Sequence, residues 1–138
     1  MKKNHEKAPP LRFPEFIGSW KEESISQLIE RTSIPIEVEE DAAYTEIGIR
    51  SHGRGVFHKE PGTGKDIGDK RVFSVVPNTF AMNIVFAWEQ AVAILTEKES
   101  GCIASHRFPM YKEKDQKSCI KFLKYFFLRP RGKFLLEL

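Results

Sequence analysis

The sequence FAMNIVFAWEQAVAIL, residues Phe80–Leu95, decides the fold. Its first part, Phe80–Trp88, is nearly continuous in apolar residues, which is typical of a strand that is covered on both faces. Its second part, Ala91–Leu95, predicts another strand. The sequence therefore predicts a sheet with Phe80–Trp88 as a central strand.

Shorter strands are predicted on both sides of this stretch. They fall at Tyr44–Arg50, Arg71–Val76 and Cys102–Ala104. Six of the nine glycines lie in Gly48–Gly68, so that region is predicted to be mostly turn and loop.

Helices are predicted at both ends of the chain. A helix is expected within residues 20–31, where a capping box could be formed by Ser19 with Glu22 or by Ser24 with Gln27. The clearest helix is Ser118–Leu128, whose apolar stripe consists of Cys119, Ile120, Leu123, Phe126 and Phe127. Pro130 interrupts this pattern, and Lys133–Leu138 is expected to begin a further helix. Strands and helices together predict an α+β fold.

The chain is predicted to be one domain with a short leader. Its 138 residues are enough for a single core that buries about two-thirds of the unfolded surface. Residues 1–10 are expected to be a flexible leader, and residues 11–138 the domain. The proline-interrupted segment Leu11–Phe16 is expected to be extended and packed onto that domain.

Composition excludes several classes of protein. No apolar run approaches the ~18 residues that a membrane-spanning helix needs, and the charged N-terminus does not resemble a signal peptide. Cys102 and Cys119 are the only cysteines, and we expect free, buried thiols in a reducing cytoplasm. A zinc site that combines them with His106 would lack the paired close spacings of known zinc frameworks.

No catalytic motif is complete. Gly62-Thr63-Gly64-Lys65 lacks the first glycine and the hydroxyl residue of a phosphate-binding loop. Gly53-Arg54-Gly55 has no third glycine at the dinucleotide-binding spacing, and Asn83-Ile84-Val85-Phe86 lacks both prolines of an amino-methyltransferase signature. The neighbours Ser105 and His106 would point to opposite faces of a strand. We therefore expect a protein that is not an enzyme and that uses no cofactor.

Positive charge gathers in the second half of the chain. Residues 1–69 contain 10 Lys/Arg and 13 Asp/Glu, a balance of −3, whereas residues 70–138 contain 12 and 6, a balance of +6. Such cations can displace counterions from nucleic acid phosphates, and Arg, Asn, Ser and His can also read base edges. The candidate DNA-binding residues form two sets. The first lies in the glycine-rich loop and consists of Arg50, Ser51, His52, Arg54, His58, Lys59 and Lys65. The second lies in the basic half and consists of Lys70, Arg71, His106 and Arg107.

The hypothesis that these residues bind DNA requires the two sets to lie on one face of the molecule. The alternative is a solvated loop whose charges only keep the protein soluble. Trp88 and Glu89 are expected to be a buried indole beside a hydrogen-bonded carboxylate, and the alternative for them is a contact in a DNA groove. Phe122, Phe126 and Phe127 are expected in the core because they lie at helical spacing, and the alternative for them is a base-stacking platform.

Several motifs in order resemble those of a known family. They are Leu11–Phe16 followed by Trp20, Ile47–Phe57, Lys70–Phe73, Asn83–Glu89 and Gly101–Phe108. Together they resemble a target-recognition domain of the specificity subunit of type I restriction–modification systems. The resemblance implies a mixed α/β domain with a small, twisted, mainly antiparallel sheet flanked by helices, which presents loops to the major groove of double-stranded DNA.

The resemblance also implies partners. In that family two recognition domains read a bipartite target, and long helices between them bind modification (methyltransferase) subunits, which a restriction subunit joins. The specificity subunit itself is not catalytic. Compared with that pattern, the sequence to Leu138 is expected to hold one recognition domain and to stop where the first long spacer helix should start, as a fragment, a single domain or a truncated gene product. The alternative function is a protein-interaction module that docks through the C-terminal apolar helix and the Phe134–Leu138 tail.

Overall fold

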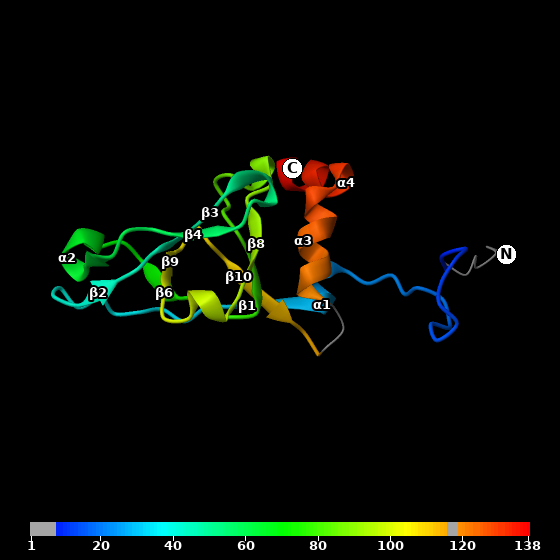
Figure 1. Ribbon diagram of the computed structural model, residues 1–138, viewed down its shortest axis with the longest axis horizontal. Coiled ribbons are helices and arrows are strands. Elements are labelled where there is room, and N and C mark those ends of the chain that lie inside the picture. The colour runs from blue at the N-terminus through cyan, green and yellow to red at the C-terminus, as the bar shows by residue number, and fades with distance from the viewer. Residues whose placement is uncertain (1–7, 116–118) are drawn as a thin grey trace.

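A computed structural model describes residues 8–115 and 119–138 and has an α+β fold (Figure 1). The leader predicted at residues 1–10 lies largely outside the described residues. The helices are α1 (Ile25–Leu28), α2 (Gly64–Ile67), α3 (Ile120–Leu128) and α4 (Pro130–Glu137), with 3-10 helices η1 (Ser51–Gly53), η2 (Ala87–Glu89) and η3 (Glu97–Glu99). The strands are β1 (Ile29–Thr32), β2 (Ala43–Tyr44), β3 (Ile47–Ile49), β4 (Val56–His58), β5 (Gly62–Thr63), β6 (Val72–Ser74), β7 (Thr79–Met82), β8 (Val92–Leu95), β9 (Ile103–Ser105) and β10 (Met110–Glu113).

The largest sheet has four antiparallel strands in the order β1-β10-β7-β8. β7 pairs with β8 over its whole length, from Thr79 opposite Leu95 to Met82 opposite Val92, and with β10 on its other side. Three two-stranded antiparallel ladders, β2-β5, β3-β4 and β6-β9, complete the β-structure. The predicted central position of the strand that begins near Phe80 is thus confirmed.

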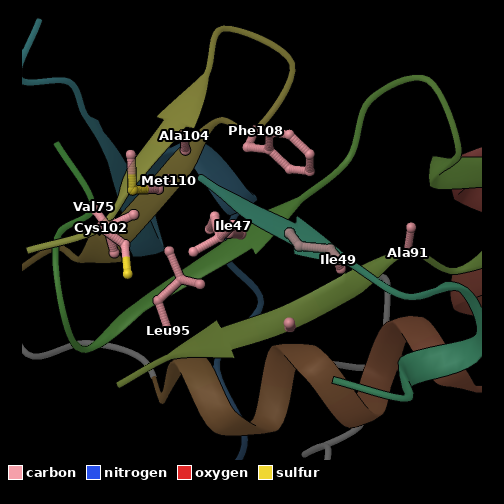
Figure 2. Packing of buried hydrophobic residues seen from close by; sticks show 11 residues of the cluster. Ile47, Ile49, Val75, Ala91, Leu95, Cys102, Ala104, Phe108 and Met110 are labelled. Atoms are coloured by element: carbon pink, nitrogen blue, oxygen red, sulfur yellow. The ribbon is translucent and has the colours of Figure 1, made fainter. Parts of the chain in front are cut away.

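Both faces of the β7-β8 pair are buried. Ala81, Ala93 and Leu95 belong to a buried cluster with Ile47 and Ile49 of β3. Figure 2 shows Leu95 packed with Ile47 and Ile49 in this cluster. Phe80 and Val92 point to the opposite face, where they pack against Ile120, Leu123 and Phe127 of α3. The rings of Phe80 and Phe127 stack with centroids 5.7 Å apart. Alternation along the two strands therefore divides the core between α3 and the small ladders.

The predicted strand Phe80–Trp88 is too long. β7 ends at Met82, because the Asn83 side chain accepts a hydrogen bond from the Val85 N–H at 3.1 Å and turns the chain. The following residues form a loop around η2. Trp88 is 53% exposed, so the expectation of a buried indole is wrong.

The predicted helix at residues 20–31 is also mostly wrong. α1 is a single turn, in which the Ser24 N–H donates to Gln27 Oε1 at 3.0 Å, as one of the two expected capping boxes requires. The chain becomes extended at Ile29 and forms β1 against β10, with Ile29 opposite Glu113 and Thr32 opposite Met110. Pairing with a distant strand outweighs local helix propensity here.

The C-terminal helix is confirmed as α3, and Ser118 lies outside the described residues. Of the predicted core phenylalanines, Phe127 is buried and Phe126 half-buried, but Phe122 is 66% exposed, so its assignment to the core is wrong. The second helix begins at Pro130 instead of Lys133, because proline is well suited to the first helical position.

The remaining predictions concern exposed segments. Leu11, Phe13 and Phe16 are 89%, 70% and 61% exposed, so this segment is not packed onto the domain as expected. Cys102 is buried as predicted, whereas Cys119 is exposed. In residues 8–115 and 119–138, no helix has the length and apolar character needed to cross a membrane.

Candidate nucleic-acid interface

Four of the predicted DNA-binding residues line one hollow. Lys59 and Lys70 come from the glycine-rich region and its C-terminal end, and His106 and Arg107 follow β9. The hollow has a volume of about 390 Å³, and its other lining residues are Asn83, Val85, Phe86, Ser105 and Phe108. We call this site the cationic hollow. Lys59 is the one residue of the first predicted set that lines the hollow, whereas Lys70, His106 and Arg107 all belong to the second set, so the two sets meet only through Lys59.

Backbone hydrogen bonds bring these segments together. The Lys59 N–H donates to the Glu46 carbonyl oxygen at 2.9 Å, which fixes the chain just after the β3-β4 hairpin. The Phe108 N–H donates to the Ser105 carbonyl at 3.1 Å and closes the turn that carries His106 and Arg107. The Ile84 N–H donates to the Arg107 carbonyl at 3.0 Å and holds the loop after β7 against that turn.

One acidic side chain offsets part of this charge. The Glu46 carboxylate lies 2.7 Å from the Lys70 ammonium and 4.0 Å from that of Lys59. Within the described part of the chain, neither His106 nor Arg107 forms an ion pair, and both are exposed. Arg107 is therefore a cation of the hollow whose guanidinium remains available to an anion.

A second hollow of about 330 Å³ adjoins the first. The two share the lining residues Lys59, Asn83, Phe86 and Phe108. The second hollow also includes Ser51 and Phe57 of the glycine-rich region. The two hollows therefore meet at one cation, one amide and two aromatic rings.

Arg50 and Ser51 take part in internal contacts. Arg50 Nη1 donates to the Val56 carbonyl at 3.1 Å, and its guanidinium lies 5.1 Å from the Phe57 ring centroid. The Ser51 hydroxyl donates to Glu89 Oε2 at 2.8 Å. Glu89 thus has the hydrogen-bonded role expected for it, although Trp88 beside it is exposed.

His52 and Arg54 lie in the exposed turn around η1. His52 has a φ of 59°, a left-handed conformation that side chains with a Cβ rarely adopt. The adjacent Gly53 N–H donates to the Gln90 carbonyl at 3.1 Å. The turn is therefore tied to the loop around η2, and neither His52 nor Arg54 lines the cationic hollow.

The other predicted residues do not line the hollow. Lys65 is on α2, at the opposite end of the molecule from α3 and α4 (Figure 1). Arg71 places its guanidinium 5.9 Å from the Phe73 ring centroid. His58 lies 3.5 Å from the Glu99 carboxylate.

Glu99 is a buried carboxylate that is kept ionised by its partners. Burial raises its pKa, but hydrogen bonds from the Thr96 N–H at 2.7 Å and hydroxyl at 3.0 Å, together with His58, outweigh that effect and hold the pKa below its ordinary value. Burial, followed by the charge of Glu99, raises the pKa of the Cys102 thiol. These groups stabilise the fold and lie outside the cationic hollow.

The interpretation of Phe80–Trp88 as a strand missed residues that line the hollows. Asn83, Val85 and Phe86 are positioned by the loop that follows β7. Asn83 was a signal that the strand ends there, because an asparagine side chain commonly accepts a hydrogen bond from the backbone N–H two residues later and so forms a turn. A nine-residue strand would also have been long compared with the usual five or six residues.

The cationic hollow brings together the ammonium groups of Lys59 and Lys70, the guanidinium of Arg107 and the amide of Asn83. In residues 8–115 and 119–138, no three His, Cys, Asp or Glu side chains are grouped so that they could hold a metal ion. No protein-family model matches the chain, and no curated protein is significantly similar to it.

Proposed function

We propose that this chain binds double-stranded DNA in a sequence-specific manner through the cationic hollow. In this proposal it reads one half of a bipartite target for a cytoplasmic type I restriction–modification complex and catalyses no reaction itself. The observation that carries the proposal is the convergence of Lys59, Lys70 and Arg107 with Asn83 on one depression.

Each group has a chemical role that suits DNA. The ammonium groups of Lys59 and Lys70 supply affinity by replacing the counterions of phosphates. Arg107 is suited to guanine or to a phosphate because its guanidinium donates two parallel hydrogen bonds, and Asn83 has the amide that pairs with adenine.

The direct test is a fluorescence-anisotropy titration of the full chain with randomised duplex DNA at ~50 mM salt, where phosphate contacts are strongest. We expect binding that selects a short shared sequence. Arg107→Ala and Lys59→Ala should weaken binding and lower the slope of log affinity against log salt concentration by about 0.9 for each lost phosphate contact.

Lys65→Ala is the matched control, because Lys65 is an exposed cation on α2 that does not line the hollow. It changes the net charge by the same amount as Lys59→Ala and should leave affinity nearly unchanged. Equal effects of Lys59→Ala and Lys65→Ala would show that overall charge, and not the cationic hollow, binds the DNA. No binding by the wild-type protein at ~50 mM salt would reject the proposal.

Assembly with modification and restriction subunits is a separate part of the proposal. It is tested by mixing the chain with purified modification subunits and measuring methylation of DNA that carries the selected half-site. Methylation or cleavage by the chain alone would contradict its non-catalytic role.

A protein-interaction module is the second candidate, and exposed apolar groups on α3 and α4 favour it. Phe122, Tyr125 and Phe134 are 66%, 63% and 59% exposed. Leu135→Glu tests this face, because Leu135 is 42% exposed whereas Leu136 packs against the core. Light scattering that shows a monomer before and after Leu135→Glu would remove self-association as the function.

A further inference from the structure

The loop between β7 and β8, Asn83–Ala91, exposes four large apolar side chains. Ile84, Val85, Phe86 and Trp88 are 53%, 44%, 46% and 53% exposed. An isolated exposed apolar residue needs no explanation, but four within five positions form a patch of the kind that marks an interaction site. The patch cannot be attributed to the core, which begins again at Ala91.

The backbone of this loop is closed by its own hydrogen bonds. The Asn83 N–H donates to the Ala91 carbonyl at 2.9 Å, and the Ala91 N–H donates to the Phe86 carbonyl at 3.3 Å. The Gln90 N–H donates to the Ala87 carbonyl at 2.8 Å, and Gln90 adopts a left-handed conformation that ends η2. The apolar side chains are thus displayed by an ordered turn.

Neighbouring elements brace the loop from outside. Gln90 accepts from the Gly53 N–H through its carbonyl at 3.1 Å and donates through Nε2 to the Phe127 carbonyl at 3.1 Å. Glu89 accepts from the Ser51 hydroxyl at 2.8 Å. The loop is therefore held by η1 on one side and α3 on the other. A group that is fixed before binding loses less conformational entropy when it binds.

The apolar patch adjoins the cationic hollow. Phe86 lines both hollows, and Val85 lines the cationic one together with Lys59, Lys70 and Arg107. An apolar partner surface alone would gain nothing from three cations at its edge. A nucleotide fits both features, because its base has an apolar face for an aromatic ring and its phosphate can bind the cations.

From this arrangement we infer that the Asn83–Ala91 loop is an apolar wedge, in which Phe86 and Trp88 stack on an unstacked nucleobase of the DNA in the cationic hollow. This inference rests on the proposed function and adds a base-stacking contact to it. Apolar side chains that enter a base step unstack it partly and kink the duplex. A base that is already unpaired costs less to unstack, so it should be the preferred ligand.

The test compares affinity and salt dependence for Phe86→Ala, Trp88→Ala and Arg107→Ala on the same duplex. Loss of one stacked base should weaken binding about 5- to 150-fold. Because stacking releases no counterions, the two aromatic variants should keep the wild-type salt slope, whereas Arg107→Ala lowers it. Phe86→Tyr is the matched control, since it retains the ring and should retain affinity. Circular dichroism of each variant checks that the fold is unchanged.

Trp88 provides a direct optical readout. The other tryptophan, Trp20, is 66% exposed on the N-terminal segment, so Trp20→Phe leaves Trp88 as the sole indole. In that background, stacking should quench the emission of Trp88 on addition of DNA. A duplex with one unpaired base should bind more tightly than the fully paired duplex, and Phe86→Ala should abolish that difference.

The outcomes separate the wedge from the proposed function. If the wild-type protein binds DNA but Phe86→Ala and Trp88→Ala bind equally well and Trp88 emission does not change, the wedge is wrong and DNA binding stands. If the wild-type protein binds no DNA, both fail. If the aromatic variants change only the mass measured by light scattering, the patch contacts protein, which also overturns the wedge.

Discussion

The hydroxyl of Ser51 donates a hydrogen bond to the carboxylate of Glu89 at 2.8 Å, across 38 positions of sequence. This contact joins the glycine-rich turn to the loop that displays Phe86 and Trp88. Ser51 and Glu89 also line the hollow beside the cationic one. Ser51 was expected to contact DNA directly, and its observed bond gives it a positioning role for a neighbouring loop.

Ser51→Ala should therefore weaken the fold and loosen the loop together. Loss of one hydrogen bond to a charged group, in a partly buried position, should lower the free energy of unfolding by about 1.5–3 kcal/mol. Urea denaturation measures the change. Ser19→Ala, at an exposed serine, is the control and should stay within about 0.5 kcal/mol of the wild type. Equal stabilities of the two variants would show that the bond contributes nothing.

Glu46→Gln should strengthen DNA binding. The Glu46 carboxylate lies 2.7 Å from Lys70 and 4.0 Å from Lys59, so it competes with phosphates for both ammonium groups. Removing its charge should raise affinity about two- to five-fold at low salt, which corresponds to the small energy of an exposed ion pair. Anisotropy titration measures the gain. Glu30→Gln, which breaks the 3.4 Å pair with Lys112, removes the same charge elsewhere. A lower affinity for Glu46→Gln in a stable protein would contradict the assigned role of Lys70.

The sequence predicted the elements whose signal is local. The apolar run Ala91–Leu95 became β8, and the stripe within Ser118–Leu128 became α3. The helix prediction for Ile29–Thr32 was wrong because the extended conformation of this segment depends on pairing with β10. The residues of β10 lie about 80 positions further along the chain and show no strong strand pattern. Local propensity could not reveal that ladder.

The candidate site shows the same limit. The cationic residues were identifiable by type, but their grouping depends on strand pairing. The β3-β4 hairpin and the turn after β9 bring Lys59 and Arg107 to one hollow, whereas Lys65 of α2 does not line it. Exposure of Trp88 follows from the Asn83 turn, which shortens β7 and moves the indole out of the sheet.

Acid should destabilise the protein partly through Glu99. Its folded-state pKa is lower than the ordinary value of 4.5, so folding favours the ionised form. This contribution is complete above about pH 4.5 and is lost as the pH falls through the lower, folded-state pKa. The stability of Glu99→Gln should therefore depend less on pH in the acid range. At neutral pH the substitution should lower the free energy of unfolding by about 1–3 kcal/mol. Thermal melts across the pH range measure this. Glu97→Gln, at an exposed residue of the same 3-10 helix, should retain the wild-type curve. Identical acid limbs for all three proteins would rule out this linkage.

The two thiols should react at very different rates. Cys119 is exposed, whereas Cys102 is buried and its pKa is raised by burial and by Glu99. Because the thiolate is the reactive form, a thiol reagent at neutral pH should label Cys119 quickly and Cys102 only when the domain opens. Peptide mass mapping of a labelling time course distinguishes them, with Cys119→Ser as the variant that isolates Cys102. Rapid labelling of Cys102 in that variant would show that the cluster around β9 opens readily.

Gly132→Ala tests the corner between α3 and α4. Gly132 is buried, and a Cβ at this position would overlap the backbone carbonyl of Phe126 and the Cα of Phe127. Backbone atoms cannot move aside as a flexible side chain could, so overpacking should cost about 1–3 kcal/mol of unfolding free energy. Arg131→Ala, at the preceding exposed position, should change stability by no more than about 0.5 kcal/mol.

Gly132→Ala should also loosen the Asn83–Ala91 loop. α4 lies against η2, and the Phe127 carbonyl accepts from Gln90 Nε2 at 3.1 Å, so a displaced corner removes a brace of that loop. Hydrogen exchange should then accelerate at the amide of Gln90 in Gly132→Ala but not in Arg131→Ala. Unchanged exchange at Gln90 in a destabilised Gly132→Ala protein would show that the loop is held by its own hydrogen bonds and by η1 alone.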